Sequence, residues 1–196
     1  MNATPSLASL IERAQRNDPQ AFEALVDLYA SRLYGFLYRL TGQREDAEDL
    51  VQEVFVRLVR TIDRYQHDGR FEAWLFRIAT NLARDRLRRV RRSIGTTSWE
   101  ALSADSEHGG RAASGARMED PSSPAPDRSI NLEEDVDRLQ HVLAKLPAAE
   151  REVILLRHYT QMSFAEIART MGTPLGTALA RSHRGLAKLR RMMEES

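Results

Sequence analysis

Apolar residues recur every three or four positions along most of this chain, and that spacing is typical of amphipathic α-helices rather than of β-strands. The pattern is clearest on residues 19–41, where Asp18 and Pro19 offer an N-cap and a first-turn proline and Gly42 offers a stop. It recurs on residues 50–62 and 70–82, and a short segment at 7–14 carries it too. We therefore expect an all-α chain whose first half is a compact helical bundle.

The helical period stops in the middle of the chain. Residues 93–131 are rich in Gly, Ser, Ala, Pro and Asp, and they contain no sustained apolar repeat. From Ser93 to Asp135 the chain has nine acidic residues against three arginines. Such a segment buries too little apolar surface to offset the entropy of ordering it. The sequence thus predicts two small helical domains, residues 1–92 and 132–196, joined by a flexible acidic linker at 93–131.

The second half carries the signals of a helix-turn-helix. Ser163 and Glu166 have the three-residue spacing of a capping box, and Gly172 ends the helix that they open. The next helix begins at Thr173-Pro174, and helices joined by so tight a turn are typical of this motif. We expect one stripe of that next helix to pack and another to face outward. The packing stripe is Leu175, Leu179, Ser182, Leu186, Leu189 and Met193, and the outward stripe is Thr177, Arg181, Arg184, Lys188 and Arg191.

The net charge of +1 conceals two strongly basic segments. Residues 61–92 have nine arginines against four acids, and residues 169–193 have six basic residues and no acid. A solvated helix face usually mixes both signs, because opposite charges at i,i+4 stabilise the helix. A long helix that carries only cations therefore favours DNA, with guanidinium groups meeting phosphates and guanine edges in the major groove.

The residue inventory argues against an enzyme. The chain has no cysteine, and its five histidines are scattered rather than paired at ligand spacing. It has no HExxH, no GxSxG and no phosphate-binding glycine loop. We therefore expect no catalytic residue, no metal and no cofactor. The absence of a signal peptide and of a long apolar run predicts a cytoplasmic location.

Two surfaces of the first half are candidates for binding partners. Asp49, Gln52 and Glu53 form a polar, acidic surface that suits a basic protein, although the helix dipole also favours acids near a helix start. Phe71 and Trp74 precede a polar stripe on the next helix, and rings beside arginines suit single-stranded DNA. Both rings also fall on the apolar spacing, which favours core packing for each of them over contact with DNA. The polar stripe consists of Arg77, Asn81, Arg84 and Arg88.

Three stretches carry the most specific pattern in the chain: DAEDLVQEVFVRL, FEAWLFRIATNLARDRLRR and LPAAEREVILLRHYTQMSFAEIARTMGTPLGTALARSHRGLAKLR. Together they resemble a bacterial sigma factor of the extracytoplasmic-function group, the minimal branch of the sigma-70 family. The resemblance covers residues 21–92 and 139–191 in the order of the family. It implies a protein that binds core RNA polymerase and directs it to promoters by recognising −35 and −10 elements and assisting strand opening.

The resemblance also implies roles for individual residues. Asp49, Gln52 and Glu53 would contact a coiled coil of the largest polymerase subunit. The loop from Tyr65 to Arg70 would hold a flipped base of the −10 element, and Trp74 would support the melted strand. The implied −10 contacts are Tyr65, Arg70, Trp74, Arg77, Asn81, Arg84 and Arg88, and the implied −35 contacts are Thr177, Arg181, His183, Arg184, Lys188 and Arg191.

The last helix departs from the family pattern. Where the family commonly reads GTVKSRLHRAR the chain has GTALARSHRGL, so Leu179 stands for a usual lysine and Ser182 for a usual leucine. We expect an altered −35 preference from these changes. An anti-sigma factor is left open as a further partner. The alternative function is a helix-turn-helix regulator that acts without being a polymerase subunit, which the second basic surface in the first half disfavours.

Overall fold

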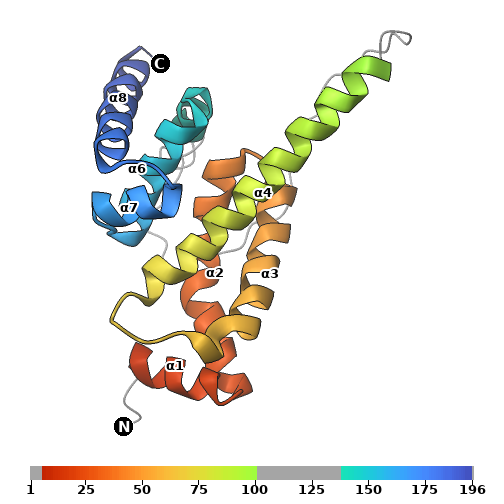
Figure 1. Cartoon of the computed structure of the whole chain (residues 1–196), viewed down its shortest axis with the longest axis vertical. Helices are drawn as coiled ribbons and strands as arrows, with labels where there is room; N and C mark the ends of the chain where they lie inside the picture. The colour runs from red at the N-terminus through yellow and green to blue at the C-terminus, as the bar shows by residue number, and fades with distance from the viewer. Residues whose placement is uncertain (1–5, 101–137, 196) are drawn as a thin grey trace, which may run out of the picture.

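The computed structural model describes residues 6–100 and 138–195. All of the regular elements in these two ranges are α or 3₁₀ helices and none is a strand, which confirms the all-α prediction (Figure 1). The helices are α1 (Leu7–Gln15), α2 (Pro19–Thr41), α3 (Arg44–Thr61), the short 3₁₀ helix η1 (Ile62–Arg64), α4 (Phe71–Glu100), α6 (Ala148–Thr160), α7 (Phe164–Met171) and α8 (Leu175–Glu194), with a further helical segment at 138–145.

Helices α2, α3 and α4 form the bundle of the first half, and α1 lies across one end of it (Figure 1). Local signals set the ends of α2 as expected. The Asp18 carboxylate accepts a hydrogen bond from a first-turn backbone N–H at 3.0 Å, and Gly42 ends the helix in the left-handed region at φ 77°. In the core, the rings of Phe36 and Phe76 meet edge to face with centroids 5.2 Å apart.

Two details of the first half differ from the sequence prediction. Helix α4 continues to Glu100, beyond the boundary expected at Arg92, and no proline in this stretch stops it from propagating. Val26 and Val59, which the apolar period groups with the core, are 37% and 48% exposed because they lie at the edges of their apolar stripes. The rest of the expected linker, residues 101–131, lies outside the described residues.

Helices α6, α7 and α8 make up the second half, and α7 and α8 form the helix-turn-helix. The predicted capping box is present: the Ser163 hydroxyl accepts from the Glu166 backbone N–H at 3.3 Å, and the Glu166 carboxylate accepts from the Ser163 backbone N–H at 2.8 Å. Gly172 ends α7 at φ 61°, a conformation that side chains other than glycine rarely adopt. Local sequence therefore fixes the turn that positions α8.

Helix α8 packs on α6 through small side chains. Its buried residues are Ala178, Ser182 and Gly185. A Cβ placed on Gly185 would lie 2.8 Å from Ile154 Cδ1 and 3.1 Å from Glu150 Cβ, so a larger residue here requires these side chains of α6 to shift. Among the large apolar side chains of α8, Leu189 and Met192 also pack against the core.

The predicted stripes of α8 are only partly correct. Ser182 is buried and Leu189 and Met193 are half-buried as expected, and Arg184 and Arg191 are exposed as expected. Leu175, Leu179 and Leu186 were expected to pack, but they are 48%, 44% and 51% exposed. Thr177 and Arg181, expected to face outward, are half-buried. The apolar period located a helix with two faces, and its packed face combines the small buried residues with Leu189.

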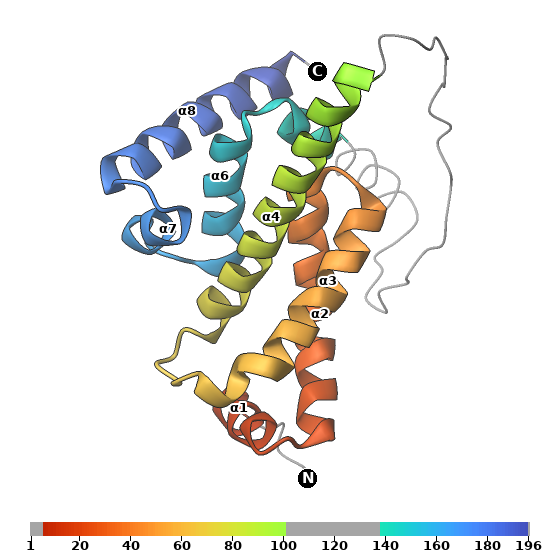
Figure 2. The same ribbon diagram turned by 45° about the vertical axis from the view of Figure 1, so that its right-hand side comes forward.

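The two halves of the chain pack against each other through α6, which contacts α2 and α4 (Figure 2). The Tyr159 ring meets the Phe36 ring edge to face with centroids 5.7 Å apart. Arg39 donates a hydrogen bond to the Tyr159 hydroxyl at 3.0 Å, and Arg32 donates to the Tyr159 carbonyl at 2.7 Å. The sequence predicted two linked domains and contained no signal for this contact between them.

Candidate functional site

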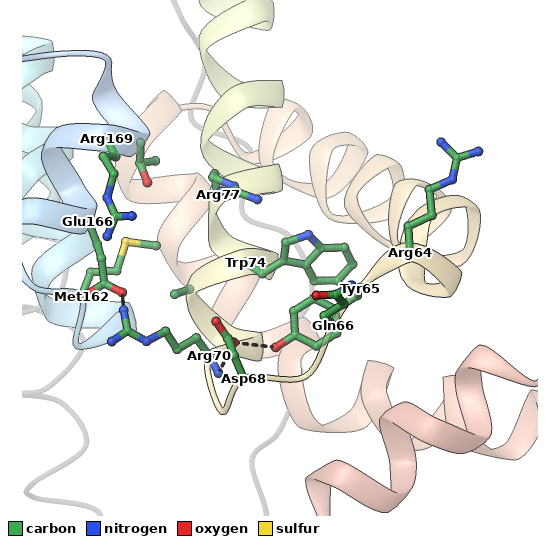
Figure 3. Close-up of a pocket in the computed structure, with 12 residues that line it drawn as sticks. Arg64, Tyr65, Gln66, Asp68, Arg70, Trp74, Arg77, Met162, Glu166 and Arg169 are labelled. Carbon is green, nitrogen blue, oxygen red and sulfur yellow. Dashed lines mark hydrogen bonds and ion pairs between the residues drawn. The ribbon is translucent and has the colours of Figure 1, made fainter.

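A cleft of about 440 Å³ lies where the two halves meet, between the loop before α4 and helix α7 (Figure 3). It brings together four of the residues predicted for −10 DNA, and arginines from both halves line it. The predicted residues at the cleft are Tyr65, Arg70, Trp74 and Arg77, and the second half contributes Met162, Glu166, Arg169 and Thr170.

Aromatic rings form one wall of this cleft. The Tyr65 and Trp74 rings have centroids 4.7 Å apart, and each lies within 5.6 Å of the Phe71 ring. Phe71 is buried in the core, so the core-packing alternative holds for that ring. Trp74 is half-buried: one part of its side chain packs against the core, and another part lines the cleft.

The loop from Tyr65 to Arg70 is held by hydrogen bonds near both ends. The Gln15 side chain of α1 donates to the Tyr65 carbonyl at 2.6 Å and to a carbonyl of η1 at 3.0 Å. The Asp68 carboxylate accepts from the Arg70 backbone N–H at 3.1 Å. Burial raises the pKa of Tyr65, whose ring lies beneath the loop. The rim of the cleft is therefore fixed by polar contacts rather than by apolar packing alone.

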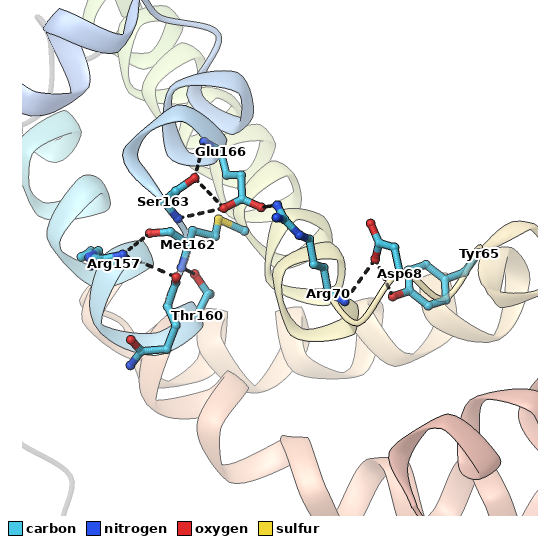
Figure 4. Close-up of polar contacts among 9 residues, drawn as sticks. Tyr65, Asp68, Arg70, Arg157, Thr160, Met162, Ser163 and Glu166 are labelled. Carbon is cyan, nitrogen blue, oxygen red and sulfur yellow. Dashed lines mark hydrogen bonds and ion pairs between the residues drawn. The ribbon is translucent and has the colours of Figure 1, made fainter.

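Arg70 reaches across the cleft to the second half, where its guanidinium donates to the Glu166 carboxylate (Figures 3 and 4). The same carboxylate accepts from the Ser163 hydroxyl at 2.6 Å, as part of the α7 cap. The hydrogen bond from Ser163 lowers the pKa of Glu166, and the charges of Arg70 and Arg169 lower it further. One ionised carboxylate thus joins the start of α7 to the loop before α4.

Arg84 makes a second link between the halves. Its guanidinium donates to the Glu152 carboxylate of α6 and, at 2.8 Å, to the Thr170 carbonyl near the end of α7. The side chains of Arg84 and Glu152 are only 22% and 9% exposed. Burial raises the pKa of Glu152, although the hydrogen bond from Arg84 acts in the opposite direction. This pair is better shielded from water than the Arg70–Glu166 pair.

The other predicted residues of α4 are open to solvent. Arg77, Asn81 and Arg88 are exposed, and together with Arg84 they make up the predicted polar stripe. Within the residues that the structure describes, Arg77 and Asn81 make no side-chain hydrogen bond or ion pair, and Arg88 lies 3.7 Å from Asp85. The predicted stripe on α4 therefore exists, with its most buried member held by the second half.

The predicted acidic surface lies on α3, which contributes no residue to the cleft. Asp49, Gln52 and Glu53 are all exposed. Asp49 also pairs with Arg86 of α4 at 3.0 Å, and the same guanidinium contacts Asp46 at 2.7 Å. Among the described residues, Gln52 and Glu53 have no side-chain partner. Asp49 thus serves the packing of α3 on α4 as well as the surface.

The predicted basic residues of α8 do not share one environment. Arg184 and Lys188 lie 3.4 Å and 2.9 Å from the Glu150 carboxylate of α6. That contact stays within the second half and keeps both cations close to the α6–α8 interface. Of the remaining predicted residues, His183 and Arg191 are exposed, and Thr177 and Arg181 are half-buried.

Sequence reasoning missed the carboxylates that face these arginines. Glu150 and Glu152 are 6% and 7% exposed, and Glu166 was recognised only as a helix cap. A signal for the first two exists, because both lie in the apolar helix AAEREVILLRHYT, and a buried carboxylate requires a partner. Which arginine serves as that partner depends on how the two halves pack, which local spacing does not encode.

The cleft offers ionic and aromatic chemistry. Guanidinium groups attract phosphates, and exposed ring faces stack on bases. Among residues 6–100 and 138–195, no three His, Asp or Glu side chains are grouped so as to hold a metal ion. None of the helices described there is both long enough and apolar enough to cross a bilayer.

Two family models match this chain. Sigma-70 region 2 matches residues 25–93, which include α3 and the first part of α4. Sigma-70 region 4 matches residues 142–191, which include α6, α7 and most of α8. The matches fall on the two helical halves and leave out the segment between them.

Curated relatives extend over nearly the whole chain. The ECF RNA polymerase sigma factor SigW of Bacillus subtilis (strain 168) is 30% identical over 195 residues, covering 94% of this chain and 95% of SigW. The RNA polymerase sigma factor CarQ of Myxococcus xanthus is 35% identical over 188 residues, covering 94% of this chain and 96% of CarQ. SigE of Mycolicibacterium smegmatis is 38% identical over 170 residues, covering 87% of this chain and 60% of SigE.

Two solved structures share the fold. The sigma factor RpoE in complex with the anti-sigma factor NepR from Bartonella quintana has a TM-score of 0.65 and 22% identity, over 88% of this chain and 96% of RpoE. CnrH in complex with the cytosolic domain of CnrY has a TM-score of 0.60 and 24% identity, over 95% of this chain and 96% of CnrH. With both region models matched in order and relatives of nearly equal length, the chain belongs to the extracytoplasmic-function group of sigma-70 family sigma factors, which direct RNA polymerase to promoters.

Proposed function

We propose that this sigma factor binds core RNA polymerase through α3 and reads promoter DNA through α4 and α8. Residues 1–92 then serve polymerase docking and −10 recognition, residues 132–196 serve −35 recognition, and residues 93–131 connect them. The chain acts by binding and strand separation, and its side chains make or break no covalent bond. A cytoplasmic location accompanies this proposal, because the polymerase and the promoter are there.

One observation carries the −10 assignment: the arginines around α4 already hold anions. Arg84 binds the Glu152 carboxylate, and Arg70 binds the Glu166 carboxylate. A guanidinium that fits a carboxylate also fits a phosphate, because both ligands present paired anionic oxygens to its planar donors. Trp74 adds a ring beside these cations, which suits the stacking of an unpaired base.

The same contacts make the described arrangement a closed state. A phosphate and a carboxylate cannot occupy one face of the Arg84 guanidinium together, so −10 binding requires Glu152 to move away. Separation of the halves also costs the contacts of Tyr159 with α2. A partner that binds both halves in a separated arrangement shifts this equilibrium by its preference for the open chain. Core polymerase is the partner we assign to that role.

The polymerase surface is assigned to the outer side of α3. Gln52 and Glu53 are exposed there, and their side chains have no partner among the described residues. Acidic side chains in this setting suit a basic protein surface, with which they can pair without losing a contact of their own. Asp49 joins them at the edge, and there it must share its carboxylate with Arg86.

An anti-sigma factor is a further partner that we propose. An apolar groove of about 410 Å³ runs between α6, α8 and the segment at 138–145, where Leu139, Leu143, Ile154 and Leu189 line it. RpoE, which shares the fold, was solved with the anti-sigma factor NepR. An apolar segment of such a protein could fill the groove and so hold the chain apart from polymerase.

Reconstituted transcription tests the function. Core polymerase with this chain should start transcripts from a subset of a promoter library that shares −35 and −10 sequences, whereas polymerase alone should not. Glu53→Arg should weaken core binding by about tenfold in a competition assay, because it reverses an exposed charge at the proposed docking surface. The matched control is Glu23→Arg, the same change at an exposed position on α2.

Two results would count against this assignment. Equal core binding by the Glu53→Arg and Glu23→Arg variants would remove α3 as the docking surface. Specific binding to a promoter duplex without polymerase, together with no transcript in its presence, would favour the helix-turn-helix regulator instead.

A further inference from the structure

The outer face of α8 is apolar near its start, although the helix as a whole is basic. Leu175 and Leu179 are about half exposed there, and Gly176 between them has open space around it. Helix α8 lies at the outer edge of the second half, with α6 between it and α4 (Figure 2). These two leucines therefore face outward on the first turns of the second helix of the helix-turn-helix.

Leu175 and Leu179 face outward because other residues of α8 occupy its interface with α6. Ala178, Ser182 and Gly185 are the buried residues of α8, and Leu189 packs beside them, whereas Leu175 and Leu179 lie outside this face. On the other flank, Glu150 draws Arg184 and Lys188 toward α6. The most accessible part of the helix start is thus uncharged.

The surroundings of the leucines select an anionic partner. Residues 169–193 contain six basic residues and no acid, so the field around this face attracts a polyanion. Duplex DNA is a polyanion that also offers an apolar group at a base edge, the C5-methyl of thymine in the major groove. The first turns of a recognition helix are the part that reaches base edges.

We propose that Leu175 and Leu179 contact thymine methyl groups in the −35 element, so that this chain selects thymine at one or two positions by apolar contact. The inference rests on the proposed function, in which α8 reads the −35 duplex. It adds a specificity determinant that differs in kind from the basic residues. Those residues contribute mainly through phosphates and guanine edges, whereas the leucines distinguish thymine from other bases by its methyl group.

Deoxyuridine provides the test, because it differs from thymidine only by the absent methyl group. Holoenzyme made with the full chain is assayed for initiation on its preferred promoter, with uracil placed at single thymine positions of either −35 strand. We expect a loss of about fourfold at the contacted position, which corresponds to the ~0.8 kcal/mol of one buried carbon group. Uracil in the spacer between the elements is the DNA control and should have no effect.

Protein variants then identify the contact. Leu175→Ala and Leu179→Ala should lower initiation on the thymine promoter and should each remove the discrimination at the position that its side chain contacts. Leu186→Ala is the matched control, because this leucine is equally exposed but lies two turns beyond the proposed reading face. It should keep the full preference for thymine. All three side chains are at the surface, so the variants should unfold at the wild-type temperature.

The outcomes separate this inference from the function on which it rests. If the holoenzyme recognises a −35 sequence but treats thymine and uracil alike at every position, the methyl contact is refuted and the function stands. If both alanine variants keep the full discrimination, another side chain reads the methyl and the inference is wrong. If no −35 sequence is recognised, the proposed function itself fails.

Discussion

Helices α4 and α8 are the two basic helices of this molecule, and their charges are held in different ways. Around α4, Arg70 and Arg84 bind carboxylates that belong to the other half of the chain. On α8, Arg184 and Lys188 bind Glu150 of the adjacent helix in the same half. The first set of contacts is lost when the halves separate, whereas the second set is retained.

The difference means that opening the chain would have unequal effects on the two surfaces that we propose for reading DNA. Separation frees the guanidinium groups of Arg70 and Arg84 and leaves α8 as it is. Under the proposed function, the −35 surface is therefore present in the closed state, and the −10 surface is completed only in the open one. A sequence with two equally basic helices gives no hint of this asymmetry, because the asymmetry lies in the partners of the charges.

The largest expected effect comes from breaking the packing that holds α8 within its own half. Gly185→Leu should destabilise the protein by about 1–3 kcal/mol, because the new side chain collides with Ile154 and Glu150. The same change at Gly176, which has open space around it, should cause no loss and could gain up to ~1 kcal/mol of helix propensity. Urea unfolding of the two variants measures both values. Equal destabilisation would show that the close approach of α6 and α8 is not what the glycine provides.

A smaller effect is expected from removing the shielded link between the halves. Glu152→Gln should lower the free energy that favours the closed arrangement of the halves by about 1 kcal/mol, because Arg84 loses its charged partner. The open fraction should then rise roughly fivefold. The chain has no cysteine, so two can be introduced for dyes on α1 and near the end of α8, and energy transfer reports the distance between the halves.

Two controls make that measurement specific. The charge-swapped variant Arg84→Glu with Glu152→Arg should restore closure while abolishing −10 binding, because the pair is rebuilt and the DNA-facing cation is lost. Asp46→Asn removes a partner of Arg86 within the first half and should leave the distance unchanged. A distance that does not respond to Glu152→Gln would show that the Arg84 pair does not contribute to closure.

The smallest expected effect is a dependence of stability on pH that involves Glu166. Its folded pKa lies below the ordinary value of 4.5 because of the Ser163 hydrogen bonds, so its stabilisation is complete above pH 4.5 and is lost as the pH falls through the folded pKa. Glu166→Gln should lower the free energy of unfolding by about 0.5 kcal/mol at pH 7, and the gap to wild type should close in acid. Denaturant unfolding at several pH values measures this. A gap that is unchanged in acid would mean that the charge of Glu166 does not matter.

Local signals in the sequence predicted the ends of the helices well. Asp18, Gly42, Gly172 and the Ser163 capping box act through backbone groups a few residues away, so their effect can be inferred from spacing alone. Tyr65, Trp74 and Arg77 are close together in the chain, and all three line the cleft. Their individual roles in DNA binding remain predictions.

The predictions that were wrong or missing concern side chains whose contacts are made with residues distant in the sequence. The period of α8 placed Leu179 and Ser182 on one packing stripe, but Ser182 is buried and Leu179 is 44% exposed. The partner of Arg84 is separated from it by 68 positions, so no local rule links the two. Apolar spacing locates a helix face to within one stripe, and the final rotation depends on how closely the neighbouring helix can approach.

The hydrogen bonds from Gln15 to the loop before α4 have a consequence for affinity. A loop that is already tied to α1 has few conformations to lose when a ligand enters the cleft, so less of the binding free energy is spent on ordering it. Gln15 lies on the first helix and lines no part of the cleft, yet the preorganisation of the rim depends on it. Tightness of binding at this site can therefore change through a residue that never touches the ligand.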